Sequence, residues 1–165
     1  MTATIREMGA EHWPGVERIY AAGIAGGSAT FAEAPPSREE FLATRIPGLS
    51  VVAVDGDGAV QGWVAATPTS SREVYRGVIE HSVYVDPAAA GQGVGLALLN
   101  ALAARARARG FWTIQSAILA ENLPSLALHD KAGFRRVGRR ERIGFMTYGP
   151  YAGAWRDTIL VELRL

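Results

Sequence analysis

A glycine-rich turn between an apolar strand and a helix constrains the fold of this chain most strongly. The segment reads Val83-Tyr-Val-Asp-Pro-Ala-Ala-Ala-Gly-Gln-Gly-Val-Gly-Leu96, and a helical pattern then runs to Arg109. Glycine lets backbone N–H groups converge without obstruction by Cβ, and the amino end of a helix adds partial positive charge. Together these features favour a pyrophosphate site. The alternative is that the glycines merely close a tight strand-to-helix turn.

Three kinds of phosphate site compete for this turn. A P-loop requires Gly-Lys-Ser/Thr, whereas Gly95 is followed by Leu96. A dinucleotide fingerprint requires Gly-x-Gly-x-x-Gly and an acidic residue about 20 positions later. The spacing here is Gly-x-Gly-x-Gly, and the next strand, expected at Phe111–Leu119, has no acidic residue. The remaining interpretation is the pyrophosphate of coenzyme A.

Hydrophobic periodicity predicts one α/β domain over residues 1–165, with a mixed sheet and helices on both of its faces. Expected helices span His12–Ile24, the segment from the Ser37 cap to about Pro47, Val94–Arg109 and Asn122–Ala132. Expected strands span Ile5–Met8, Leu49–Val54, Ala59–Ala66, Gly77–Val85, Phe111–Leu119, Phe134–Arg142 and Asp157–Leu165. Ser37 with Glu40 forms a capping box, and the helix after Val94 should bury one leucine-rich side.

Charge and composition exclude several classes of protein. Seventeen basic and sixteen acidic residues give a net charge of +1, which argues against a nucleic-acid binder. The chain has no cysteine, and its three histidines lack metal-ligand spacing, so no metal site is expected. Residues 1–7 do not resemble a secretory leader, and no apolar stretch approaches the roughly 20 residues needed to cross a membrane. We therefore expect a cytoplasmic protein that does not bind membranes.

The glycine turn resembles the Arg/Gln-x-x-Gly-x-Gly/Ala signature of the GNAT superfamily of N-acetyltransferases. Gly93 and Gly95 match the small positions, and Ala90 replaces the usual Arg or Gln. A second segment, from Asn122 to Phe134, resembles the family's Asn-x-x-Ala/Ser-x-x-Leu-Tyr-x-Lys-x-Gly-Phe motif. The resemblance implies a mixed, mostly antiparallel sheet and acetyl-CoA as donor. It also implies cofactor contacts at Val83, Tyr84, Val85, Ala90, Gly91, Gln92, Gly93, Val94, Gly95, Leu96, Asn122 and Ser125.

The region before the turn narrows the resemblance to the phosphinothricin and methionine sulfoximine acetyltransferase branch. Matching segments are Arg72-Glu-Val-Tyr-Arg76 before a Glu-His-Ser-Val-Tyr-Val strand, Thr30-Phe31 with Glu33, and Gly153-Ala-Trp-Arg-Asp157. The resemblance implies an acetyltransferase for the primary amine of a small amino-acid-like molecule, and a homodimer. Residues 144–153 look longer than the family's usual connection, and we expect them at the acceptor wall.

Glu80 is the predicted general base, because a free α-amine has a pKa near 8 and must lose a proton before it attacks a thioester. On a strand, Glu80 shares one face with Ser82 and Tyr84, whereas His81 lies on the other face and is interpreted as structural. The alternative is a Glu80 that is exposed or paired with Arg76.

His129 stands where the family has a tyrosine that can protonate the departing thiolate. An imidazole can serve as that acid. The alternative, equally open at this point, is a histidine that only hydrogen-bonds the cofactor or a neighbouring strand. By resemblance, the N–H of Val83 or Val85 would polarise the thioester oxygen.

The predicted acceptor contacts are Phe31, Glu33, Arg72, Tyr75 and Arg76. Guanidinium groups bind carboxylates and phosphinates in a forked geometry, so the two arginines favour an anionic acceptor. Each of these residues also fits ordinary loop packing or a solvated turn. Two further functions remain alternatives: acetylation of a protein N-terminus or a polyamine, and a module that senses acetyl-CoA without turnover.

Overall fold

The computed structural model describes residues 3–165, so Met1 and Thr2 of the predicted domain lie outside the described residues. Within this range one sheet has the strand order β1-β2-β3-β4-β5-β7-β6. All neighbouring strands are antiparallel except β4 and β5, which confirms the mixed, mostly antiparallel sheet. The strands are β1 (Thr4–Glu7), β2 (Ser50–Val54), β3 (Val60–Pro68), β4 (Val78–Val85), β5 (Thr113–Leu119), β6 (Arg135–Phe145) and β7 (Trp155–Arg164).

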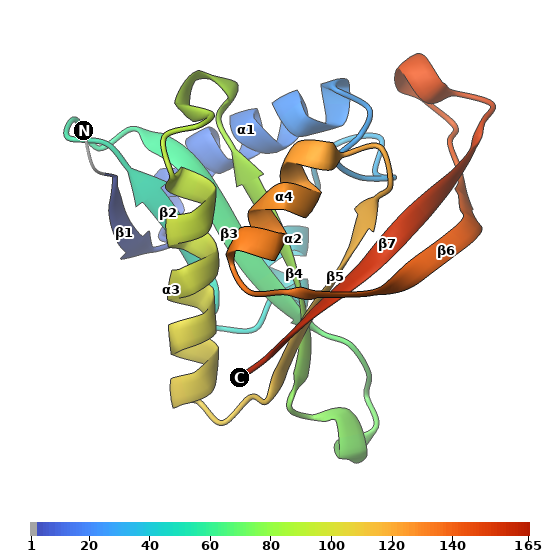
Figure 1. Cartoon of the computed structure of the whole chain (residues 1–165). Coiled ribbons are helices and arrows are strands. Elements are labelled where there is room, and N and C mark those ends of the chain that lie inside the picture. The colour runs from blue at the N-terminus through green and yellow to red at the C-terminus, as the bar shows by residue number, and fades with distance from the viewer. Residues whose placement is uncertain (1–2) are drawn as a thin grey trace.

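Helices cover both faces of this sheet, as the sequence predicts (Figure 1). Helices α3 and α4 lie on one face, and α1 with α2 lies on the other. Their bounds are α1 (Trp13–Ala25), α2 (Arg38–Thr44), α3 (Val94–Ala108) and α4 (Leu123–Lys131). No helix within residues 3–165 is long and apolar enough to span a membrane.

The α3 side of the sheet holds the larger core. Leu98, Leu99, Leu102 and Ala106 of α3 are buried, which confirms the predicted inward side of this helix. They pack against apolar residues of the central strands, including Val64 and Ile79. Burying a leucine side chain stabilises a fold by about 1.5–3 kcal/mol, so this helix is firmly anchored to β3 and β4.

The opposite face holds an aromatic core beneath α1 and α2. The rings of Trp63 and Tyr84 stack with centroids 4.8 Å apart, and Tyr20 and Phe41 contact the Trp63 ring. Tyr84 comes from β4, so this core fixes the position of the strand that leads into the glycine turn.

The predicted helix caps agree with the structure, although α2 ends at Thr44 and not near Pro47 as expected. The Ser37 side chain accepts a bond from the Glu40 amide while Glu40 reaches back to the Ser37 amide, which confirms the capping box. The Asn122 side chain caps α4 by accepting a bond from the Ser125 amide. Gly110 follows α3 with a φ of 84°, in the left-handed region that glycine adopts readily.

The last two strands are longer than the sequence predicts. The expected strands ended at Arg142 and began at Asp157, whereas β6 continues to Phe145 and β7 begins at Trp155. The pair Phe145 and Trp155 extends the ladder into a hairpin that projects from the body of the domain (Figure 1). Because most of β6 is exposed on both faces, its sequence lacks the alternating apolar pattern that marks a half-buried strand.

Candidate active site

The central strands β4 and β5 separate beside the glycine turn. They pair from Val78 with Thr113 to Glu80 with Gln115, and no further pairs follow toward their carboxyl ends. A cavity of about 270 Å³ occupies the opening. Both strands, the amino half of α4 and the loop around Thr30 and Phe31 form its walls. Ligands of α/β proteins commonly bind beyond the carboxyl ends of strands, and this opening has that position.

The glycine turn has the open backbone that a diphosphate requires. Gly91 and Gly93 have φ values of 76° and 82°, and a Cβ built on either would meet no atom within 4 Å. Gly93 is the N-cap of α3 and offers no side-chain cap, and the Ala97 amide bonds to its carbonyl. The amides of the first turn, at residues 94–96, therefore point outward from the helix end. This geometry suits the diphosphate of coenzyme A.

The predicted cofactor residues on β4 line the cavity directly. Val83 and Tyr84 contribute to its wall, and Val85 ends the strand. β4 pairs with β3 in unbroken register from Ile79 to Val85. The opening therefore arises from the divergence of β5 from β4.

Glu80 lies at the point where β4 and β5 part. Its side chain is exposed and lines the cavity, and the Gln115 side-chain amide donates a bond of 3.1 Å to Glu80 Oε2. Arg76, which the sequence offered as an alternative partner, instead forms an ion pair of 3.5 Å with Glu73. Among the described residues, only Gln115 donates a side-chain hydrogen bond to the Glu80 carboxylate, and it uses one of the two oxygens.

His129 and His81 form a buried pair on the other face of β4. Their Nε2 atoms are 2.9 Å apart, although the residues are 48 positions apart in the chain. His129 Nδ1 lies 2.7 Å from the Ser125 carbonyl oxygen and 3.4 Å from Ser125 Oγ. This pairing is a feature that the sequence prediction missed. The available signal was the predicted position of His81 on the strand face opposite Glu80, which helices cover and where a helix residue could meet it.

These distances fix where the protons of the pair reside. A nitrogen 2.7 Å from a carbonyl oxygen must carry hydrogen, so His129 holds its proton at Nδ1 and presents a bare Nε2. His81 must then donate from Nε2, which leaves its buried Nδ1 without a hydrogen-bond partner among the described residues. Burial lowers the pKa of His81 to about 3, and the neighbouring His129 adds to this shift. Burial also lowers the pKa of His129, so the pair is uncharged at neutral pH.

Asn122 and Ser125 meet at the amino end of α4, beside the cavity that both line. The Asn122 side chain accepts from the Ser125 amide at 3.2 Å and donates to the Ser28 carbonyl at 3.0 Å. Asn122 therefore connects the helix to the loop that follows α1. The two residues predicted to contact the pantetheine arm are adjacent at one end of the cavity.

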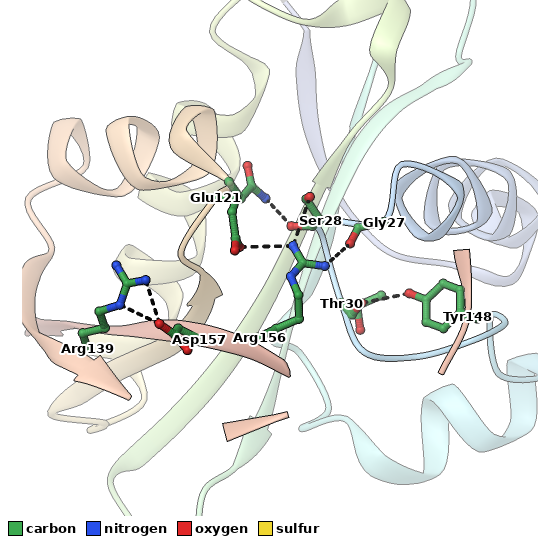
Figure 2. A network of polar contacts seen from close by, with 9 residues as sticks. Gly27, Ser28, Thr30, Glu121, Arg139, Tyr148, Arg156 and Asp157 are labelled. Atoms are coloured by element: carbon green, nitrogen blue, oxygen red, sulfur yellow. Dashed lines mark hydrogen bonds and ion pairs between the residues drawn. The ribbon is translucent and has the colours of Figure 1, made fainter. Parts of the chain in front are cut away.

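The predicted acceptor residues separate into two groups. Phe31 lines the cavity, and Glu33 of the same loop accepts a bond from Thr147 Oγ1 in the β6–β7 hairpin. Residues 144–153 thus lie against the loop that carries Phe31, and their place at an acceptor wall stays a prediction. Figure 2 shows a second link, in which the Tyr148 hydroxyl donates to the Thr30 carbonyl at 2.8 Å.

Arg72, Tyr75 and Arg76 lie in the connection between β3 and β4, outside the walls of this cavity. The Arg72 guanidinium lies over the Tyr75 ring at 5.6 Å, and that of Arg76 lies over Trp112 at 5.3 Å. Tyr75 instead lines a separate hollow together with Gln115. The structure therefore does not bring these three residues together with Phe31 and Glu33 within one chain.

Side chains that could hold a metal ion do not gather in the described part of the chain, where no three of His, Asp or Glu cluster.

Three comparisons with known proteins bear on this site. Residues 11–134 match the model of the acetyltransferase (GNAT) family. The chain is 34% identical to an L-methionine sulfoximine/L-methionine sulfone acetyltransferase of Pseudomonas aeruginosa over 170 residues, covering 100% of this chain and 96% of the relative. It is 35% identical to a phosphinothricin N-acetyltransferase of Alcaligenes faecalis, covering 96% and 81%.

A solved structure gives the same result for the fold. A phosphinothricin acetyltransferase from Sinorhizobium meliloti, determined in complex with acetyl-CoA, superposes with a TM-score of 0.87 at 36% identity, over 100% of this chain and 89% of that one. The open glycine turn and the parted strands of this chain are consistent with these full-length similarities. The chain belongs to the acetyltransferase (GNAT) family and is an N-acetyltransferase that uses acetyl-CoA as its donor.

Proposed function

We propose that this enzyme acetylates the primary amine of a small amino-acid-like molecule of the methionine sulfoximine or phosphinothricin type. The observation that carries the proposal is the position of Glu80. Glu80 lines the cavity between the parted strands, on the strand that leads into the Gly91–Gly93 turn. Two relatives that match almost the whole chain carry the names of such enzymes.

The size and lining of the cavity support a small acceptor. Its volume of about 270 Å³ lies below the usual range of ligand pockets, roughly 300–1,000 Å³. Phe31 and Tyr84 supply apolar and aromatic surface, and Glu80 supplies the negative charge that an ammonium group prefers.

In the proposed reaction acetyl-CoA supplies the thioester, and the chain supplies the proton transfers and the orientation. The Glu80 carboxylate accepts the proton of the acceptor ammonium, which leaves a neutral amine able to attack. The Gln115 amide holds one oxygen of this carboxylate in place, and the other would accept the proton. Residues 91–96 hold the diphosphate through backbone amides, and Asn122 with Ser125 borders the pantetheine arm.

The second part of the proposal assigns His129 the protonation of the departing thiolate. Because the neutral ring carries only the Nδ1 proton, it would do this as an imidazolium, after taking up the proton that the amine loses on attack. His129 itself lines the cavity, and Ser125 Oγ lies 3.4 Å from its Nδ1. A His129→Phe variant would lower kcat if the imidazole handles this proton. A His129 that only hydrogen-bonds His81 would leave kcat unchanged in a folded variant.

Steady-state release of coenzyme A tests the acceptor class. L-methionine sulfoximine and phosphinothricin should support turnover, and spermidine and an N-terminal peptide should not. Turnover with spermidine or peptide alone would overturn the acceptor class. Binding of acetyl-CoA without thiol release from any amine would instead favour a sensing module.

The proposal also includes a homodimer in the cytoplasm, where acetyl-CoA is available. β6 is an edge strand of the sheet, and large apolar side chains are exposed along the β6–β7 hairpin. Exposed apolar patches of this kind commonly mark interfaces, and an open edge favours pairing with another strand. The residues concerned are Val137, Ile143, Phe145, Tyr151 and Trp155. Light scattering after gel filtration should give the mass of two chains, and a monomeric mass would contradict this part.

A further inference from the structure

The guanidinium of Arg156 lies buried between the acceptor loop, residues 27–33, and the amino end of α4. We propose that Arg156 is a positioning residue that sets the affinity and selectivity for the acceptor by holding this loop in place. The inference deepens the proposed function and rests on it. Arg156 does not line the cavity, so it acts through the loop rather than by touching the acceptor.

Arg156 binds the loop at its first two residues. Its side chain is only 2% exposed, with Nη1 donating to the Gly27 carbonyl at 2.8 Å and Nη2 to Ser28 Oγ at 3.3 Å (Figure 2). Gly27 lies 129 positions earlier in the chain than Arg156. Residues 27–33 contain no helix or strand, so contacts of this kind decide where the loop lies.

The same guanidinium is fixed from two other sides. Glu121, at the turn from β5 to α4, accepts from Nη2 at 3.1 Å, and the Tyr151 ring lies 4.0 Å below Cζ. A buried charge persists only with such partners, because its transfer from water is costly. Apolar replacements of buried ion pairs are often as stable, so the retained charge favours a role in fixing the geometry.

Hydrogen bonds next to Arg156 also join the loop to the amino end of α4. The Asn122 side chain donates to the Ser28 carbonyl at 3.0 Å, beside the bonds from Arg156. Farther along the loop, Tyr148 of the hairpin donates to the Thr30 carbonyl at 2.8 Å. The loop is thus held at Gly27, Ser28 and Thr30, just before Phe31 enters the cavity wall, and the bond from Thr147 holds Glu33 just after it.

The hairpin also determines how closely Phe31 can approach. A Cβ built on Gly144 would lie 2.3 Å from Phe31 Cζ, so the ring rests directly on the backbone of β6. A shift of the loop would therefore move an aromatic wall of the cavity. Displacements of about 1 Å around a reacting group can change rates by on the order of 100-fold.

The test compares Arg156→Met with Arg139→Met in the full-length enzyme. Arg139 lies in the same hairpin, and its exposed side chain bonds to Asp157 at 2.8 Å, away from the loop (Figure 2). Arg156→Met should raise the KM for L-methionine sulfoximine by about tenfold or more and change the ratio of its kcat/KM to that of phosphinothricin. The Kd of acetyl-CoA, measured by calorimetry, should stay within about twofold. Arg139→Met should leave all of these values unchanged.

A milder variant keeps the test decisive if Arg156→Met does not fold. Tyr148→Phe removes only the bond to the Thr30 carbonyl, and it should raise the acceptor KM about fivefold, the value of one neutral hydrogen bond. An unchanged acceptor KM in folded variants would overturn the proposal. A loss of acetyl-CoA affinity as large as the rise in the acceptor KM would also overturn it, because that result indicates a general structural role for Arg156. Failure of the wild-type enzyme to acetylate either amino acid analogue would instead refute the proposed function.

Discussion

Mild acid should destabilise this protein through its buried histidine pair. Burial lowers the pKa of His81 from 6.5 to about 3 in the folded chain. Between these values the unfolded chain binds a proton at His81 that the folded chain does not. The stabilisation is therefore complete above pH 6.5 and is lost as the pH falls toward 3.

The size of this loss follows from the pKa difference. One proton taken up on unfolding changes the free energy of unfolding by about 1.4 kcal/mol per pH unit. Between pH 7.5 and pH 5, His81 alone lowers the free energy of unfolding by about 2 kcal/mol. Any pKa below about 4 for His81 in the folded chain gives the same value. His129 shifts in the same direction and adds to the loss. The carboxylates whose pKa values are lowered contribute mainly below pH 5; they are Glu40, Asp86, Asp130, Asp157 and Glu162.

Urea unfolding of the wild type and His81→Gln at pH 7.5 and pH 5 measures the effect. Glutamine keeps an N–H donor for His129 but does not titrate, so the variant should take up about one proton fewer on unfolding at pH 5. Ser116→Ala, which removes a 3.3 Å bond to the His81 carbonyl and leaves the pair intact, is the control. If the wild type is equally stable at both pH values, or if His81→Gln loses as much stability at pH 5 as the wild type, His81 does not cause the pH dependence.

Two further substitutions test the site itself. Glu80→Gln should lower kcat by about 10²–10⁴-fold and leave acetyl-CoA binding intact, because it removes only the proton acceptor; unchanged turnover would exclude Glu80 from the mechanism. Gly93→Val should weaken acetyl-CoA binding, since it places a branched side chain at a φ of 82° in the open turn. Gly58→Val imposes similar strain at a φ of 86° in the β2–β3 turn and should leave that affinity unchanged. Equal affinities in all three proteins would discredit the placement of the diphosphate.

Local signals in the sequence predicted the order of elements and the helix ends. The leucine pattern of α3, the Ser37 capping box and the Asn122 cap depend on residues within one or two helical turns. The opposite faces of Glu80 and His81 followed from strand alternation alone. These features are confirmed because neighbouring residues decide them.

The features that the sequence did not predict depend on contacts between residues far apart in the chain. The sequence placed His81 on the face opposite Glu80 but did not show that α4 brings His129 to it. In the sequence, Arg156 was only one position of the Gly153–Asp157 motif. Its burial against Gly27 depends on how the β6–β7 hairpin packs on a loop near the other end of the chain. The acceptor role of Arg72, Tyr75 and Arg76 stays a prediction, because these residues lie outside the cavity.

Backbone amide chemical shifts during a titration with acetyl-CoA show directly whether the glycine turn binds the cofactor. If the glycine turn holds the diphosphate, the amides of residues 91–96 should move most, with Asn122 and Ser125 also affected and Gly58 unmoved. Saturable binding that leaves residues 91–96 unperturbed, or no binding at all, would contradict the account.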